Sequence, residues 1–178
     1  MELNEEIVKE YFCSVKQCFI QENILYKVTS KSKNGKKSGS GWSDIDLLAY
    51  SPKVNEFLDI EVKYREVAPF HRGKDKASNL DKVINNFTLE SRISKIEELN
   101  PNSLSVKRIF VTNRKAFTNK KRDEYEGLLK ENNIELIYFE TVFQELQSHF
   151  QKNSKKMTSV LGQVLRIINN QNNSNESV

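Results

Sequence analysis

Apolar residues recur along the chain with two different spacings. Spacings of three and four residues indicate amphipathic helices, and alternation or short apolar runs indicate strands. The predicted helices cover residues 3–22, 74–99, 119–133, 141–150 and 156–168. The predicted strands cover residues 24–29, two segments within 43–66, and residues 106–113 and 134–139. This order predicts an α/β sandwich in which helices cover a central mixed sheet.

The segment SDIDLLAYSPKVNEFLDIEVKYRE, residues 43–66, reads as two strands joined by a turn. Strand side chains alternate between faces, so one face of this hairpin is apolar and the other carries charge. The apolar positions are Ile45, Leu47, Ala49, Leu58, Ile60 and Val62, and the charged positions include Asp44, Asp46, Asp59, Glu61 and Lys63. Because both apolar rows must face one core, a symmetric turn over residues 51–56 sets Asp46 opposite Glu61 and Asp44 opposite Lys63.

Two carboxylates on directly opposed strand positions repel each other unless a cation lies between them. Mg²⁺ is bound by one or two carboxylates and keeps several water ligands. A metal held in this way polarises a phosphoryl oxygen and lowers the pKa of an attacking water. Lys63 is on the same face as Glu61, where an ammonium can orient that water or stabilise charge that develops on the phosphate. The hairpin is therefore a candidate magnesium site for phosphodiester hydrolysis.

Asp46 followed across a hairpin by Glu61-Val62-Lys63 resembles the D…(D/E)xK signature of the PD-(D/E)xK nuclease superfamily. The later stretch RIFVTNRKAFTNKKRDEYEGLLKENNIELIYFETVFQEL is similar to the second half of Mrr-type restriction endonuclease domains, whose core archaeal Holliday-junction resolvases share. The likeness covers roughly residues 3–150. It implies a restriction-endonuclease-like α/β/α sandwich in which Asp46 and Glu61 bind Mg²⁺, with Mn²⁺ as a substitute, and Lys63 assists the nucleophile.

Three positions of the family pattern leave alternatives open. Asp44 would replace Asp46 as the metal ligand if the hairpin register differed. Mrr-type domains carry a Gln on the helix after the ExK strand, and this chain offers only Asn79, Asn85 or Asn86 there. The family's first-helix Glu, a further catalytic residue that reaches the metal through water, corresponds to Glu5. Two other first-helix acids, Glu6 and Glu10, point away from the apolar arc, and Glu5 itself has a competing reading as a solvated acid at a helix N-terminus.

Basic residues flank the hairpin on both sides. The segment 30–41, rich in Lys, Ser and Gly, is predicted to be a mobile loop. On the functional reading these flanking segments bind the phosphate backbone of DNA, and on the alternative reading they are solvated charge runs. The candidate DNA contacts are Lys36, Lys37, Ser40, Arg65, Arg72 and Lys74.

Length and composition limit the organisation of the chain. The chain has 178 residues and a net charge of +4, which suits a single domain over residues 1–150. A C-terminal amphipathic helix is predicted over 151–168, for packing or dimerisation, and a disordered tail over 169–178. No apolar run is long enough to cross a bilayer. Cys13 and Cys18 are too few for a zinc site and are expected to be reduced core thiols, so the predicted location is the cytoplasm.

These patterns together predict a Mg²⁺-dependent DNA endonuclease of the Mrr-like restriction type, with no organic cofactor. A structure-specific nuclease such as a Holliday-junction resolvase would share every catalytic residue. A non-catalytic DNA-binding module on the same fold is the third interpretation, although Asp46, Glu61 and Lys63 are all present. A homodimer is expected because duplex cutting needs two active sites. Because the chain has no P-loop, any motor or specificity subunit would be a separate chain.

Overall fold

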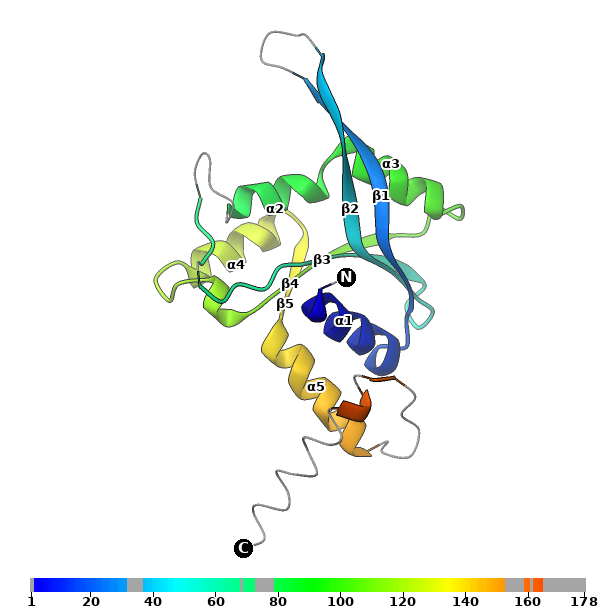
Figure 1. Ribbon diagram of the computed structural model, residues 1–178, viewed down its shortest axis with the longest axis vertical. Helices are drawn as coiled ribbons and strands as arrows, with labels where there is room; N and C mark the ends of the chain where they lie inside the picture. The colour runs from blue at the N-terminus through cyan, green and yellow to red at the C-terminus, as the bar shows by residue number, and fades with distance from the viewer. Residues whose placement is uncertain are drawn as a thin grey trace, which may run out of the picture.

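A computed structural model describes residues 2–31, 37–67, 69–72, 79–152, 159–160 and 162–164, without the side chains of 29–31 and 37–39. Its centre is a five-stranded sheet in the order β1-β2-β3-β4-β5 (Figure 1). The strands are β1 (Phe19–Lys31), β2 (Lys37–Ser51), β3 (Glu56–Val62), β4 (Val106–Thr112) and β5 (Ile134–Tyr138). The first three are antiparallel, whereas β3, β4 and β5 are parallel. The predicted α/β fold with a mixed sheet is confirmed.

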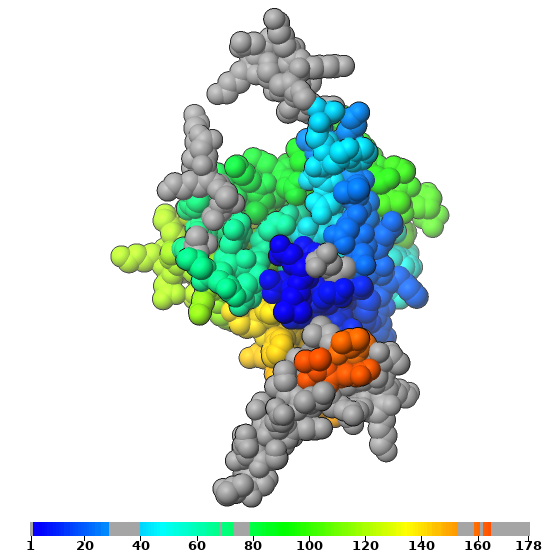
Figure 2. All heavy atoms as spheres, in the orientation of Figure 1, coloured from blue at the N-terminus to red at the C-terminus, as the bar shows by residue number. Residues whose placement is uncertain are grey.

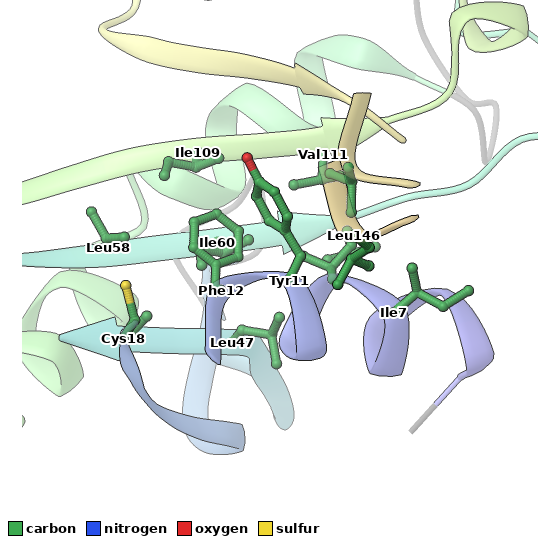
Figure 3. Packing of buried hydrophobic residues seen from close by; sticks show 14 of the residues in the cluster. Ile7, Tyr11, Phe12, Cys18, Leu47, Leu58, Ile60, Ile109, Val111 and Leu146 are labelled. Carbon is green, nitrogen blue, oxygen red and sulfur yellow. The ribbon is translucent and has the colours of Figure 1, made fainter. Parts of the chain in front are cut away.

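Helices cover both faces of this sheet. They are α1 (Leu3–Glu10), which continues as a π-helical turn over Tyr11–Val15, α2 (Leu80–Phe87), α3 (Glu90–Leu99), α4 (Arg122–Glu131) and α5 (Phe139–Lys152), with a 3₁₀ turn over Arg114–Ala116. One face packs against α1 and α5, where Tyr11, Phe12 and Leu146 meet Ile60 and Val111 (Figure 3). The other face packs against α2, α3 and α4. Strand alternation therefore places Leu58, Ile60 and Val62 toward α1 and α5, and Asp59 and Glu61 toward α2 and α3.

Two predicted helices are interrupted. The helix expected over 3–22 ends at Val15, because Gln17 has a positive φ of 58° and β1 begins at Phe19 to pair with β2. The part of the predicted helix 74–99 that is described forms two helices, α2 and α3. Thr88, which donates to the carbonyl of Asn85, and the extended Leu89 separate them.

The loop predicted over 30–41 is wrong for residues 30–31 and 37–41, which belong to β1 and β2, while residues 32–36 lie outside the described residues. Strand β1 extends to Lys31 and β2 starts at Lys37, with Val28 paired to Gly41 and Lys31 to Lys37. These ends form a two-stranded ribbon that stands away from the body of the molecule (Figure 1), and the parts of β1 and β2 that are coloured in Figure 2 lie at the upper edge of that body. Residues 29–31 and 37–41 include no large apolar residue, so these strand ends are defined by backbone pairing without an apolar pattern, which is why composition misled the prediction.

The C-terminal predictions are covered only in part. Of the helix expected over 156–168, Val160 and residues 162–164 are helical and Ser159 is a bend. The other positions, like the tail 169–178, lie outside the described residues. Gly162 lies close to the ring of Phe150 in α5, which accords with packing on the same chain.

Cys18 is buried as predicted, whereas Cys13 is exposed. Within the described part of the chain, the helices are all too short or too polar to cross a membrane.

Candidate metal centre and nucleic-acid interface

The hairpin register brings the two predicted metal ligands to adjacent strand positions. Strands β2 and β3 pair Ala49 with Leu58 and Leu47 with Ile60, as the sequence predicts. The ladder ends there, and the next residues along the two strands are Asp46 and Glu61. On the other side of β2, the β1 ladder passes from Leu47 to Ile45 without a pair at Asp46. Asp46 thus lies within β2 beside the end of the β2–β3 ladder, and its carboxylate is buried.

One ammonium group contacts both carboxylates. Lys63 follows the last residue of β3, and its Nζ lies 3.2 Å from Asp46 Oδ2 and 3.1 Å from Glu61 Oε1. Asp46 Oδ2 also accepts a hydrogen bond of 2.7 Å from the backbone N–H of Val62. Since a single cation already touches an oxygen of each acid, both acids are within reach of one ion.

Burial and neighbouring charges shift the pKa values of both Asp46 and Lys63. Burial, followed by the charge of Glu61, raises the pKa of Asp46 to about 7, although Lys63 and the Val62 N–H act in the opposite direction. Burial by itself would lower the pKa of Lys63, but the charges and hydrogen bonds of Glu61 and Asp46 raise that pKa above its ordinary value. Lys63 is therefore a positively charged donor at neutral pH, whereas Asp46 titrates in that range.

The second oxygen of Glu61 is held by groups from the helices above the sheet. Its Oε2 accepts from Arg92 Nη1 at 2.9 Å and from Asn86 Nδ2 at 3.2 Å. The amide of Asn86 is itself oriented by the hydroxyl of Tyr26, which donates to Asn86 Oδ1 at 3.0 Å. Glu61 thus pairs with Lys63 through Oε1, while Oε2 is fixed by Arg92 and Asn86. Asn86 is the one of the three candidate asparagines that contacts a predicted metal ligand.

Arg92 contacts two of the hairpin acids, and sequence patterns failed to single it out. Its side chain is fully buried, and its Nε and Nη2 donate to the carboxylate of Asp59 at distances from 2.7 to 3.2 Å. Burial lowers the pKa of Arg92, but the charges of Asp59 and Glu61 reverse this and raise it, so the guanidinium stays charged. The only signal in the sequence is its spacing of four residues from Ile96, which puts an arginine on the buried stripe of α3.

The structure also separates the alternatives at the other acidic positions. Asp44 is exposed and is paired in the ladder with Leu25, away from the Asp46–Glu61–Lys63 cluster. Glu5 accepts a hydrogen bond from the backbone N–H of Glu2 at 3.1 Å and so completes a capping box at the start of α1. A catalytic role for Glu5 stays a prediction.

The predicted DNA contacts are distributed over two regions. Arg65 follows the ExK strand, and Asn113 fixes its backbone through two hydrogen bonds of 2.8 Å. Arg72 forms an exposed ion pair with Asp81. Ser40 is exposed on the ribbon. The side chain of Lys37, together with Lys36 and Lys74 as a whole, lies outside the described residues.

A pocket of about 430 Å³ opens beside the cluster. Its floor is the end of β3, with Glu61, Lys63 and Arg65, and its other wall is the polar side of α2 and the residues around it. The carboxylate and ammonium of the cluster therefore lie in a pocket that a ligand can enter.

The donor set fits a hard divalent cation with few protein ligands. Among the described residues, no group of three or more His, Cys, Asp and Glu side chains is arranged to hold a metal. Asp46 and Glu61 supply two carboxylates, the number with which Mg²⁺ is commonly held when water fills its other positions. A site for Zn²⁺, with four nitrogen or sulfur ligands, does not fit these residues.

Comparisons with known proteins add one structural similarity. No protein-family model and no curated protein sequence matches the chain. The crystal structure of MunI restriction endonuclease in complex with cognate DNA is similar to it, with a TM-score of 0.43 and 12% sequence identity over 87% of this chain and 89% of that chain. At this level, the similarity assigns neither an activity nor a residue role.

Proposed function

We propose that the chain is a Mg²⁺-dependent nuclease that hydrolyses phosphodiester bonds in DNA, of the PD-(D/E)xK type and with Mrr-like restriction endonucleases as its nearest functional class. The observation that carries the proposal is the shared ammonium. Two buried carboxylates from adjacent strands meet one lysine at the floor of an open pocket. Burying like charges together is costly, and holding a catalytic cation gives that arrangement a purpose.

Asp46 and Glu61 would hold Mg²⁺, or Mn²⁺ in its place, which when bound polarises a phosphoryl oxygen and lowers the pKa of a bound water. Lys63 remains protonated, so it acts as a hydrogen-bond donor and a positive charge toward the phosphate or the attacking water. Arg92 and Asn86 keep Glu61 Oε2 fixed, which directs Oε1 toward the reaction centre. Glu5 remains the proposed first-helix acid.

DNA is the proposed polymer because basic residues flank the site on both sides of the hairpin. Arg65 lies in the pocket, and Lys37 and Ser40 belong to β2 in the β1–β2 ribbon. Lys36 precedes Lys37 in the sequence and lies outside the described residues. Arg72 and Lys74 follow the ExK strand and extend the same set. Cutting both strands of a duplex would require a homodimer, and a motor or specificity subunit would be a separate chain.

Cleavage assays test the proposal directly. The purified chain is incubated with linear duplex, supercoiled and four-way-junction DNA, in Mg²⁺ and in a chelator. We expect Glu61→Gln and Asp46→Asn to lose more than about 100-fold in cleavage rate, since even outer-shell partners of a metal cost about 10–100-fold. Glu98→Gln is the matched control, because Glu98 is an exposed acid on α3 whose ion pair with Lys95 lies on the surface.

Each outcome points to one reading. Cleavage of all three DNAs favours the endonuclease, and cleavage of junctions alone favours the resolvase alternative. Binding without cleavage in any metal supports the non-catalytic module. Full activity of Glu61→Gln, with the fold intact by circular dichroism, would remove Glu61 from the metal site.

A further inference from the structure

We infer that Arg65, Lys82 and Asn85 form a subsite for a second phosphate of the bound strand, next to the phosphate that is cut. This inference deepens the proposed nuclease function and rests on it. Lys82 and Asn85 belong to α2 and were not among the predicted DNA contacts. The ligand class is the phosphodiester backbone of a polynucleotide, recognised by charge and not by base.

The charge of the pocket beside Glu61 is predominantly positive. Its lining includes three cations, Lys63, Arg65 and Lys82, three side-chain amides, Asn79, Asn85 and Asn86, and one carboxylate, Glu61. That carboxylate already accepts from Lys63, Arg92 and Asn86. A concave site with cations in excess and amide donors around it is suited to an anion.

Several of these polar groups already have other roles. Lys63 contacts the two acids, and Asn86 connects Tyr26 to Glu61. The side-chain oxygen of Asn79 caps α2 by accepting from the N–H of Asp81 at 2.8 Å. We assign the subsite to three further polar side chains that line the pocket, Arg65, Lys82 and Asn85.

Helix geometry places these donors beside the metal ligands. Lys82, Asn85 and Asn86 are related by three and four residues, so they share one face of α2. Because Asn86 contacts Glu61 at 3.2 Å, that face is directed toward the catalytic cluster. Lys82 and Asn85 are exposed along its outer part, and in the described part of the chain Lys82 takes part in no salt bridge.

Arg65 completes the subsite from the sheet side. Its backbone is locked by the two hydrogen bonds to Asn113, and its guanidinium packs over the ring of Phe70 at 4.9 Å. A guanidinium that already packs against a ring on a fixed backbone loses less rotamer freedom on binding, which suits arginine for phosphate recognition. The pocket of about 430 Å³ falls in the range of about 300–1,000 Å³ that holds small ligands, so it has room for a sugar-phosphate unit beyond the scissile group.

DNA-binding measurements without catalysis test the subsite. Fluorescence anisotropy of a labelled duplex in a chelator is recorded for the wild type, Lys82→Ala, Asn85→Ala and Lys53→Ala. Lys53 is the matched control, because it is an exposed lysine in the β2–β3 turn, at the opposite end of the hairpin. We expect Lys82→Ala to raise Kd roughly 10-fold and to reduce the slope of log K against log salt by about 1, as loss of one phosphate contact predicts.

A chemical substitution in the DNA locates the contact. Once the cut position is mapped, a single neutral methylphosphonate replaces each phosphate that flanks it. At one flanking position we expect the methylphosphonate to weaken binding to the wild type and to have little further effect on Lys82→Ala, because both changes remove the same interaction. Lys82→Arg should restore most of the affinity and the coupling.

The outcomes distinguish this inference from the nuclease proposal. If the wild type cuts no DNA, the nuclease proposal fails, and the anisotropy comparison of Lys82→Ala with Lys53→Ala still decides the subsite. Equal Kd values and equal salt slopes for these two variants would show that α2 presents only a solvated polar face and would overturn the subsite. Additive effects at both flanking phosphates would likewise overturn it.

Discussion

Asp46 and Asp59 are two aspartates on neighbouring strands, both buried and both close to Glu61, yet their partners differ. Asp59 receives three hydrogen bonds from the guanidinium of Arg92, which has no exposed surface. Asp46 shares the ammonium of Lys63, whose side chain is 37% exposed. The planar guanidinium of Arg92 binds Asp59 through several donors in a fixed arrangement, whereas the ammonium of Lys63 binds Asp46 as a single charge on a flexible side chain.

This difference shows that burial of an acid alone does not define a metal site. The guanidinium of Arg92 engages both oxygens of Asp59, and both side chains are buried between α3 and the sheet, so the charge of this acid is already balanced by a protein cation. The ammonium of Lys63 lies at the pocket and can move as an ion enters. We call the buried surroundings of Asp59 and Arg92 the sealed region, and the surroundings of Asp46 and Lys63 at the pocket the open region. Glu61 belongs to both, because its Oε2 pairs with Arg92 and its Oε1 pairs with Lys63.

Removing the guanidinium tests the sealed region and has the largest expected effect on stability. Arg92→Met leaves Asp59 as an uncompensated buried charge, which should cost about 3–5 kcal/mol in the free energy of unfolding. Urea denaturation measures this loss. Lys95→Met on the same helix, which breaks a surface pair with Glu98, should cost less than about 1 kcal/mol. A loss below that value for Arg92→Met would mean that Asp59 is not held as an ion by Arg92.

The open region should make stability depend on pH through Asp46. Its pKa of about 7 in the folded state exceeds the ordinary value of 3.8, so between these values the folded protein binds more protons than the unfolded chain. The contribution of Asp46 to the stability of the metal-free protein should therefore be greatest below pH 4 and should fall by at most about 4 kcal/mol as the pH rises to 7. Comparison with Asp46→Asn isolates this contribution from those of Glu61 and Lys63, and parallel stability curves for the two proteins would contradict the prediction.

Metal binding should have the opposite pH dependence. Mg²⁺ requires an ionised Asp46, so below pH 7 its binding should release close to one proton and weaken about tenfold for each unit of pH. Isothermal titration with Mn²⁺ in buffers of different ionisation enthalpy measures both quantities. An affinity that stays constant from pH 5 to pH 8 would show that Asp46 is already ionised before the metal arrives.

The two regions also differ in how well the sequence predicts them. The hairpin register follows from alternating apolar positions and a four-residue turn, so the Asp46–Glu61–Lys63 cluster is local in sequence and could be anticipated. The groups that orient Glu61 come from far along the chain, because Arg92 is 33 residues from Asp59 and Tyr26 is 60 residues from Asn86. Which helix residues meet which strand residues depends on how α2 and α3 pack, and no short pattern records it. The ribbon was missed for a related reason, since its strands are defined by pairing and not by an apolar face.

Tyr26 provides the mildest test of the long-range connection to Glu61. Tyr26→Phe removes only the hydroxyl that orients Asn86, and it should cost about 0.5–1.5 kcal/mol in stability. Tyr50→Phe is its matched control, because Tyr50 donates an equivalent hydrogen bond of 3.0 Å to Asn55 near the turn of the β2–β3 hairpin. If Asn86 positions Glu61 for the metal, Tyr26→Phe should weaken Mn²⁺ binding severalfold, toward the roughly 10-fold typical of outer-shell changes, while Tyr50→Phe leaves it unaltered. Equal Mn²⁺ affinities in the two variants would mean that Asn86 stabilises the fold without tuning the carboxylate, and Arg92 alone would then hold Oε2.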